Sequence, residues 1–271
     1  FETDSLVNAS PATVSRAGIL YINEEDIGWR PVVESWVAVC DSKNEHKFIP
    51  GMFSKYIDRI VGITKSTENS VPVRILSQIQ TVLNIIRSML DEVNIEENKT
   101  QEVVEGIFSY ACIWAFGGAL IEGSTTSGRS TFSEGWAMEF KPTWLLKDAS
   151  VFDYFFDTKS LGFVPWSSLV QPYAPQTIGL GENDIDFGQI FVETTTVVQM
   201  RFLLAQLVKE QTPTMIVGLS GTGKSVIMKD FLASQDEYVI SETINMNFYM
   251  EHVDLQRRLE RCLDKRSGVT F

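Results

Sequence analysis

The stretch Gly218-Leu-Ser-Gly-Thr-Gly-Lys-Ser225 decides the fold class of this chain. It matches the pattern G-x-x-x-x-G-K-[ST], in which a glycine-rich loop cradles phosphate groups. The short, largely apolar run Thr214–Val217 before it predicts a strand, and Val226–Leu232 after it predicts a helix. Strand, glycine-rich turn and helix in this order indicate an α/β nucleotide-binding domain rather than a glycine-rich turn with an accidental lysine.

Each position of the motif has a physical reason. Glycines permit backbone conformations closed to other residues, so successive N–H groups turn inward around a phosphate, and the following helix N-terminus adds its dipole. Lys224 supplies a cation for the β- and γ-phosphates, and Ser225 offers a hydroxyl to Mg²⁺. The sequence therefore predicts a site for ATP or ADP with Mg²⁺, formed by Gly218, Leu219, Ser220, Gly221, Thr222, Gly223, Lys224 and Ser225.

Hydrolysis needs more than this loop, because an acid at the end of a second strand must hold Mg²⁺ and polarise water. Only Tyr238–Glu242 and the pair Asp236-Glu237 approximate such a strand after Ser225. Both follow the loop helix too closely, so we interpret them as the neighbouring strand. The acids are expected beyond Phe271 or not at all, and the segment alone is predicted not to be catalytic.

Composition narrows the function classes. The chain has 271 residues, 44% of them hydrophobic, which allows one large domain or two ordinary ones. Its formal charge of −12 makes it a poor nucleic-acid binder, because phosphate attraction requires the opposite sign. The longest apolar run, Ala111–Ile121, falls well short of the roughly 20 residues that span a bilayer, so we expect no membrane partner. Three cysteines and two lone histidines predict neither a disulfide framework nor a metal centre.

Four zones follow along the chain. Residues 1–30 contain a strand candidate at Gly18–Ile22, and residues 31–150 are predominantly helical, with apolar spacing of helical period between Val73 and Leu90. Further helices are predicted at Val32–Val39, Phe53–Ile63 and Glu102–Ile121, and a flexible loop at Gly123–Gly128. Residues 151–190 are a connector whose aromatic residues, Phe163, Trp166 and Tyr173, pack on their neighbours. Residues 191–271 open an α/β domain with a parallel sheet.

Other candidate residues have structural interpretations. Large aromatic side chains are expected to anchor the core or an interface rather than bind a ligand; they are Trp36, Trp114, Trp136, Trp144 and Trp166. The acid pairs Asp91-Glu92 and Glu96-Glu97 are expected to form a solvated helix end. The chain has no initiator methionine and stops abruptly at Phe271, so we expect it to be cut from a longer protein.

Several stretches resemble the dynein heavy chain along nearly the whole sequence. They are Ala9–Tyr21, Gly28–Pro31, Trp114–Gly118, Phe152–Tyr154, Pro165-Trp166, Asn247-Phe248 and Leu263–Gly268. The sequence Ser15-Arg-Ala-Gly-Ile-Leu-Tyr-Ile-Asn23 is more similar to axonemal than to cytoplasmic dynein heavy chains, especially to outer-arm β-type chains. The resemblance implies that residues 1–30 end the large subdomain of a second AAA+ module and that 31–150 form its helical small subdomain. It implies that 151–190 connect the modules and that 191–271 begin the third module with its P-loop.

The resemblance implies a function as part of the ATP-driven ring of a minus-end-directed microtubule motor in the axoneme of cilia and flagella. The third-module nucleotide would regulate that motor. The partners implied are the neighbouring AAA+ modules, with microtubules and the intermediate and light chains bound through other parts of the full chain. Two alternatives stay open: a structural ring segment whose nucleotide is permanently bound, and an unrelated P-loop kinase or small NTPase.

The resemblance also implies roles for residues outside the loop. Arg16 would be an arginine finger acting in trans on the first module's nucleotide, although a structural arginine closing a turn is the alternative. Ser10 stands where many AAA+ modules carry a sensor asparagine, which implies that the second module's own site is at most weakly hydrolytic. Phe191 and Val192 would contact the adenine, with ordinary packing against the sheet as the alternative.

Overall fold

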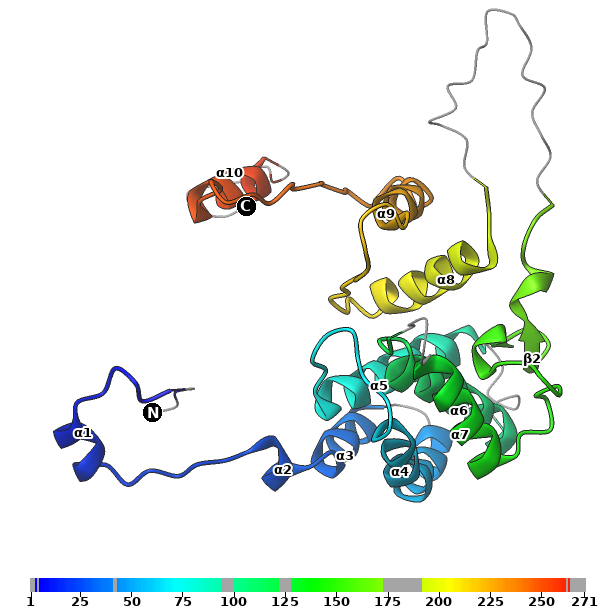
Figure 1. Ribbon diagram of the computed structural model, residues 1–271, viewed down its shortest axis with the longest axis horizontal. Coiled ribbons are helices and arrows are strands. Elements are labelled where there is room, and N and C mark those ends of the chain that lie inside the picture. Colours follow the sequence, from blue (N-terminus) through cyan, green and yellow to red (C-terminus); the bar gives the residue numbers. More distant parts are fainter. Residues whose placement is uncertain are drawn as a thin grey trace, which may run out of the picture. The chain divides into compact units, whose positions relative to one another are not determined.

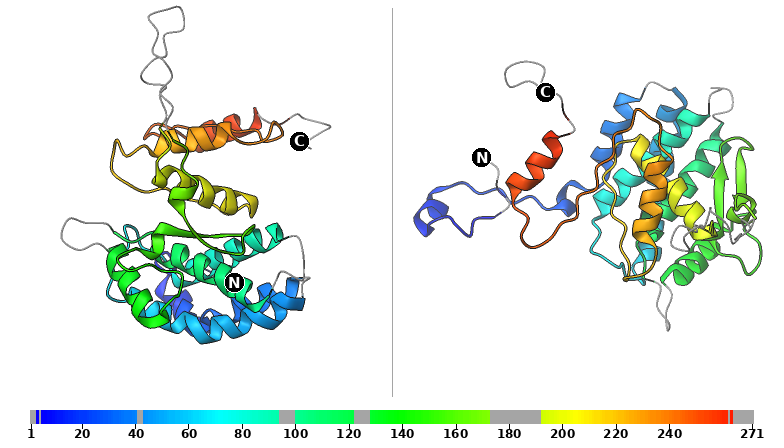
Figure 2. Two further views of the ribbon diagram at one scale, coloured as in Figure 1. Left: turned by 90° about the vertical axis from the view of Figure 1, so that its right-hand side faces the viewer. Right: turned by 90° about the horizontal axis from the view of Figure 1, so that it is seen from above.

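The computed structural model describes residues 3, 5–40, 43–93, 100–121, 128–172, 192–261 and 263. It divides into two compact units, residues 1–215 and residues 216–271. Figures 1 and 2 show the elements of both units. The elements of the first unit are α1 (Pro11–Arg16), α2 (Glu24–Ile27), α3 (Arg30–Val39), α4 (Lys43–Thr64), α5 (Ile75–Glu92), α6 (Gln101–Gly117), α7 (Gly128–Phe140), β1 (Tyr154–Asp157), β2 (Gly162–Pro165) and α8 (Thr195–Lys209), with short 3₁₀ helices η2 (Val151–Asp153) and η3 (Trp166–Ser168). The second unit contains α9 (Lys224–Ala233) and α10 (His252–Glu260).

The core of the first unit lies among α3–α7, with α6 packed against both α5 and α4 (Figure 1). The helical period predicted between Val73 and Leu90 is confirmed, because α5 buries the apolar side chains at that spacing. Those side chains are Ile79, Val82, Leu83, Ile86, Met89 and Leu90. Full burial of a leucine- or isoleucine-sized side chain stabilises a fold by about 1.5–3 kcal/mol before the entropy cost, so this stripe holds the unit together.

Helix α6 is apolar on nearly all sides and is accordingly the most enclosed helix among those described. The hydroxyl of Thr100 accepts a hydrogen bond from the backbone N–H of Val103 and so caps its start. Burial raises the pKa of the Cys112 thiol well above its usual range, so this cysteine is an inert core side chain. None of the helices in the described ranges has both the length and the apolar character needed to cross a bilayer.

The predicted connector contains an antiparallel hairpin. Strands β1 and β2 pair from Tyr154 opposite Pro165 to Asp157 opposite Gly162. The Asp157 carboxylate accepts the backbone N–H groups of Lys159 and Ser160 at 3.2 and 3.0 Å, which shapes the turn. Burial alone would raise the pKa of Asp157, but these hydrogen bonds outweigh it and lower that pKa.

The hairpin packs on α6 through aromatic residues, as the sequence predicts for the connector. Trp166 is fully buried, and its ring stacks on Phe155 with centroids 4.6 Å apart. Phe163 stacks on the half-buried Trp144 at 3.9 Å. The predicted aromatic anchors Trp36, Trp114 and Trp136 are also buried. Tyr173 lies outside the described residues.

Three predicted strands are wrong for the described residues. Gly18–Ile22, Thr214–Val217 and Tyr238–Glu242 have no ladder partner there, and Leu20, Met215 and Ile240 remain 85%, 76% and 76% exposed. A strand exists only through pairing, so an apolar run without a neighbouring strand stays irregular however suitable its residues. Helix α7 was not predicted from its mixed sequence, and residues 123–127 of the predicted flexible loop lie outside the described part.

The acid pair Asp91-Glu92 is exposed, as predicted for a helix end, but it is not merely solvated. Glu92 accepts hydrogen bonds from Thr158 and Gln206, and Asp91 lies 3.9 Å from the Lys209 ammonium. The acids therefore join α5 to its neighbours. Glu96-Glu97 lies outside the described residues.

Candidate functional site

The glycine-rich loop of the second unit has the backbone geometry that the motif requires. Gly221 and Gly223 have φ angles of +80° and +83°, in the left-handed region that side chains with a Cβ rarely adopt. Gly223 is also the N-cap of α9, so the loop leads directly into the helix N-terminus. A Cβ added to Gly218 would approach the Thr222 hydroxyl to 3.3 Å. Glycine at these three positions is therefore explained by conformation or close approach.

The Lys224 ammonium is held at the loop instead of extending into solvent. Its Nζ donates to the carbonyl of Leu219 and, at 3.2 Å, to the hydroxyl of Thr222. The same hydroxyl donates to the Leu219 carbonyl at 2.9 Å. Thr222 thus orients the lysine at the mouth of its own loop, a role that the sequence pattern did not assign because its position is variable in the motif.

These residues fit the phosphates of a nucleotide. The loop joins left-handed glycines, a helix N-terminus and a cation in one place, and a helix N-terminus with free N–H groups attracts anions. Ser225 is exposed in the first turn of α9 and can offer its hydroxyl to Mg²⁺. Across the described ranges, no cluster of three metal-ligating side chains occurs.

The segment Tyr238–Glu242 does not complete the site within the described residues. Glu242 lies 3.9 Å from Arg258 of α10, in an exposed pair, and residues 238–242 form no strand. The prediction that the acid-bearing strand lies elsewhere stays a prediction. A pairing of this exposure contributes little to stability.

Arg16 lies in the last turn of α1 and is exposed. Ser10 caps the same helix, because its hydroxyl accepts the backbone N–H of Thr13 at 3.1 Å. Ser10 therefore has a local structural role whatever its place in a nucleotide site. The position of Arg16 at a helix C-terminus suits a cation, and its side chain is exposed.

Of the two predicted adenine contacts, Val192 lies among the described residues and Phe191 does not. Val192 is 46% exposed and precedes Thr194, whose hydroxyl caps α8 by accepting the N–H of Val197. Both interpretations of Phe191 and Val192 therefore remain predictions.

A polar seam between α5 and α8 was missed by the sequence analysis. Gln206 is 3% exposed; the Ser88 hydroxyl bonds to its side-chain oxygen, and its amide donates to Glu92 at 3.1 Å. The Lys209 ammonium donates to the carbonyl of Ser88 at 2.8 Å. The seam thus holds α8, the helix that precedes the glycine-rich loop in sequence, against α5.

The end of the seam contains an acid with a perturbed pKa. Burial raises the pKa of the Glu210 carboxyl, although Arg87 at 4.0 Å opposes the shift. A signal for the seam was present in the sequence: Gln199 and Gln206 stand seven residues apart, which places both on one face of a helix. Both are buried, and Gln199 donates to the carbonyl of Phe152 at 3.0 Å.

Comparison with known proteins links this loop and the helical unit to one family. Residues 49–168 match the family model of the dynein heavy chain AAA lid domain, and residues 181–271 match that of the P-loop containing dynein motor region. The chain belongs to the dynein heavy chain family. These matches confirm the predicted AAA+ P-loop fold class, a helical subdomain followed by the opening of an α/β domain.

Individual dyneins match over the full length of the chain. It is 37% identical to dynein axonemal heavy chain 17 of Mus musculus over 278 residues, and 34% identical to the ciliary dynein beta chain of Tripneustes gratilla over 272 residues. The flagellar outer-arm beta chain of Chlamydomonas reinhardtii is 33% identical over 276 residues. The chain spans about 6% of the length of each of these relatives. The predicted resemblance to axonemal dyneins is confirmed, with β-type chains at similar identity.

Proposed function

We propose that this chain is part of the ATP-driven ring of an axonemal dynein and that it binds ATP or ADP with Mg²⁺ at a regulatory site. In this proposal residues 1–30 end the large subdomain of the second AAA+ module, and 31–150 are its helical small subdomain. Residues 151–190 connect the modules, and 191–271 begin the third. Family membership supports the proposal, and the loop geometry is its physical basis.

The observation that carries the proposal is the glycine-rich loop at the start of α9. Left-handed backbone at Gly221 and Gly223, with Lys224 held beside the loop, provides what the phosphates of a nucleotide need. A bound Mg²⁺ would supply positive charge that offsets the charge of the phosphates. Ser225 would be its protein hydroxyl ligand. The described residues supply the phosphate half of a site, so the chain alone is expected to bind nucleotide without hydrolysing it.

Arg16 is proposed to serve a neighbouring module. Its exposure at the end of α1 leaves the guanidinium accessible, and a fixed fork of donors can stabilise charge on a transferring phosphoryl group. Its role would be in trans, on the nucleotide of the first module. The full motor would act on microtubules in the axoneme and bind intermediate and light chains through regions outside these residues.

The proposal is tested by Lys224→Ala in the full-length heavy chain, with Lys229→Ala as the matched control. Lys229 lies on the same helix and is exposed, so the control removes an equal charge outside the loop. Lys224→Ala should empty the third site or weaken its nucleotide binding, because the cation beside the phosphates is lost. If the site regulates the motor, microtubule gliding should slow several-fold and ATP-induced release should fail while basal ATPase activity persists.

The same variant separates regulation from a structural role for the nucleotide. A ligand present at 100 times its Kd stabilises the folded protein by about 2.7 kcal/mol. A nucleotide that only stiffens the ring would therefore leave gliding and release normal while the melting temperature falls. Normal gliding and release would refute the regulatory role, and unchanged nucleotide binding would refute the site itself.

A further inference from the structure

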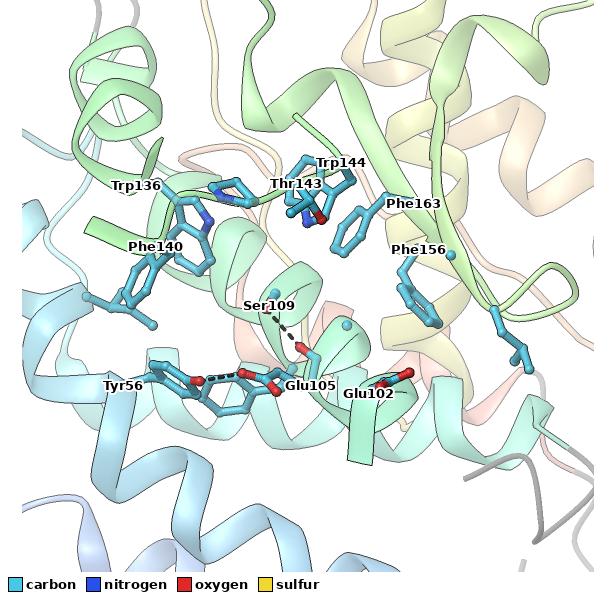
Figure 3. Close-up of a pocket in the computed structure, with 16 residues that line it drawn as sticks. Tyr56, Glu102, Glu105, Ser109, Trp136, Phe140, Thr143, Trp144, Phe156 and Phe163 are labelled. Carbon is cyan, nitrogen blue, oxygen red and sulfur yellow. Dashed lines mark hydrogen bonds between the residues drawn. The ribbon is translucent and has the colours of Figure 1, made fainter. Parts of the chain in front are cut away.

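A cavity of about 540 Å³ lies within the first unit and is independent of the nucleotide site proposed above. Residues of α4, α6, α7, the segment after α7, and the β1–β2 hairpin line it. In Figure 3 the Glu102 and Glu105 carboxylates of α6 lie on one side with the Tyr56 ring beside Glu105, and further aromatic rings, among them Trp136 and Trp144, lie on the other. This combination is unlike an ordinary packing defect, which is apolar throughout.

The aromatic side is built from rings that hold one another in place. Trp144 and Phe163 stack with centroids 3.9 Å apart and planes inclined by 14°. Trp136 and Phe140 of α7 lie 4.6 Å apart, and Trp136 is buried. Because each ring is fixed by a neighbour, the wall loses little conformational freedom when a ligand contacts it.

The opposite side is acidic. Glu102 and Glu105 stand three residues apart on α6 and therefore share one face of the helix. The Tyr56 hydroxyl donates to the Glu105 carboxylate, and Lys55 donates to that hydroxyl at 2.7 Å. Burial, reinforced by the bond to Glu105, raises the pKa of Tyr56, so the phenol stays neutral. No lysine or arginine is among the described residues that line the cavity.

The rim of the cavity already shows how a cation is held beside these rings. The Arg59 guanidinium lies 5.2 Å from the centroid of the Phe140 ring and pairs with Glu139. An arginine of this chain next to the cavity thus contacts one aromatic ring and one carboxylate. The cavity offers both kinds of group in greater number, and a planar guanidinium can stack on aromatic faces while its fork pairs with a carboxylate.

We propose that this cavity is a docking site for an arginine side chain presented by a segment of another protein. The aromatic wall would cover the guanidinium plane, and Glu102 and Glu105 would accept its N–H groups. The partner is thus a basic peptide segment, and charge complementarity selects it over an apolar one. This site goes beyond the proposed function, because helices of the first unit and the β1–β2 hairpin line it and no residue of the glycine-rich loop does.

The test measures binding of the full-length heavy chain to a blocked Gly-Arg-Gly peptide with a neutral fluorescent label, by anisotropy. The matched probe carries citrulline, which keeps the planar shape and loses the charge. Glu105→Gln keeps an acceptor for Tyr56 while removing the charge, and Glu102→Gln removes a charge from an exposed residue. Glu134→Gln on α7 is the control, since it removes the same charge from an exposed position that does not line this cavity.

We expect the arginine peptide to bind and the citrulline peptide to bind at least about tenfold more weakly, as a charge-assisted bidentate pair implies. Glu105→Gln should weaken arginine binding about tenfold and Glu102→Gln about three- to fivefold, whereas Glu134→Gln should have no effect. Equal binding of both peptides would overturn the proposal in favour of an apolar cavity. Absence of binding at millimolar peptide, or binding insensitive to both glutamate variants, would also overturn it.

Discussion

Replacing Gly106 by alanine tests how closely the β1–β2 hairpin is packed on α6. A Cβ at this position would meet the Phe156 ring at 2.2, 2.7 and 3.1 Å, distances at which the ring or the helix has to move. Phe156 is 3% exposed and packs edge-on against Phe163 at 5.5 Å, so its displacement disturbs a buried aromatic contact at the wall of the cavity described above. The substitution therefore forces the Phe156 ring out of its present position on α6.

The expected magnitude is a difference between two terms. Alanine in a helix interior is more favourable than glycine by about 0.5–1 kcal/mol, which would stabilise the variant. Overpacking of a filled core costs about 1–3 kcal/mol. Gly106→Ala should therefore lower the free energy of unfolding by up to about 2.5 kcal/mol, or by up to roughly 10 °C in melting temperature for a unit of this size.

Gly51→Ala is the matched control on α4. Nothing lies within 4 Å of a Cβ added there, and Gly51 is exposed. Only the higher helix propensity of alanine therefore affects the stability of this variant. This variant should be stabilised by about 0.5–1 kcal/mol. Urea unfolding followed by far-ultraviolet circular dichroism measures both. If Gly106→Ala proved as stabilising as Gly51→Ala, the close contact between α6 and the hairpin would be refuted.

Three further predictions follow from other contacts. Tyr110→Phe should raise stability by about 1 kcal/mol in urea unfolding, because this hydroxyl is fully buried and finds no hydrogen-bond partner among the described residues; a loss of stability would indicate a missed partner. Glu210→Gln should be more stable than the parent at pH 7, by less than about 1 kcal/mol, because burial raises the folded-state pKa of Glu210 and its charged form is disfavoured. That advantage should vanish as the pH falls below the ordinary glutamate pKa of 4.5. A stability advantage that grew at acidic pH would contradict a raised pKa of Glu210 in the folded state. Arg16→Ala in the full motor should reduce turnover at the first module by as much as 10³–10⁵, the range for arginine fingers, while nucleotide binding at Lys224 persists; unchanged ATPase activity with a lower melting temperature would return Arg16 to a structural role.

The sequence was sufficient for features that depend on local periodicity. The stripe along α5 and the continuous apolar surface of α6 predicted buried helices because burial itself generates the 3.6-residue pattern. The loop at Gly218–Ser225 could be located because left-handed backbone at Gly221 and Gly223 requires glycine. These features need no knowledge of distant residues.

Features that depend on partners could not be predicted in the same way. Gly18–Ile22 and Thr214–Val217 have the composition of strands, but composition does not supply a neighbouring strand. The cavity lined by Glu105 and Trp144 joins α6 to a segment about 40 residues away, and no spacing rule links them. Helix α7 has a polar, irregular sequence whose helical state depends on packing against α4 and α6.

At α8, the boundary of the family match in sequence differs from the boundary of the compact unit in the structure. The match to the P-loop containing dynein motor region begins at residue 181, before α8, whereas the first compact unit extends to Met215, after it. Phe202 packs on the buried Trp166 at 5.4 Å, and Gln206 is held by Ser88 and Glu92 of α5, so α8 is bound to the lid by both apolar and polar contacts. The periodicity of the sequence can establish that these residues form a helix. Only the residues against which the helix is buried determine which compact unit it joins. The helix that precedes the glycine-rich loop in sequence is therefore part of the first compact unit, and irregular residues after Lys209 connect it to that loop along the chain.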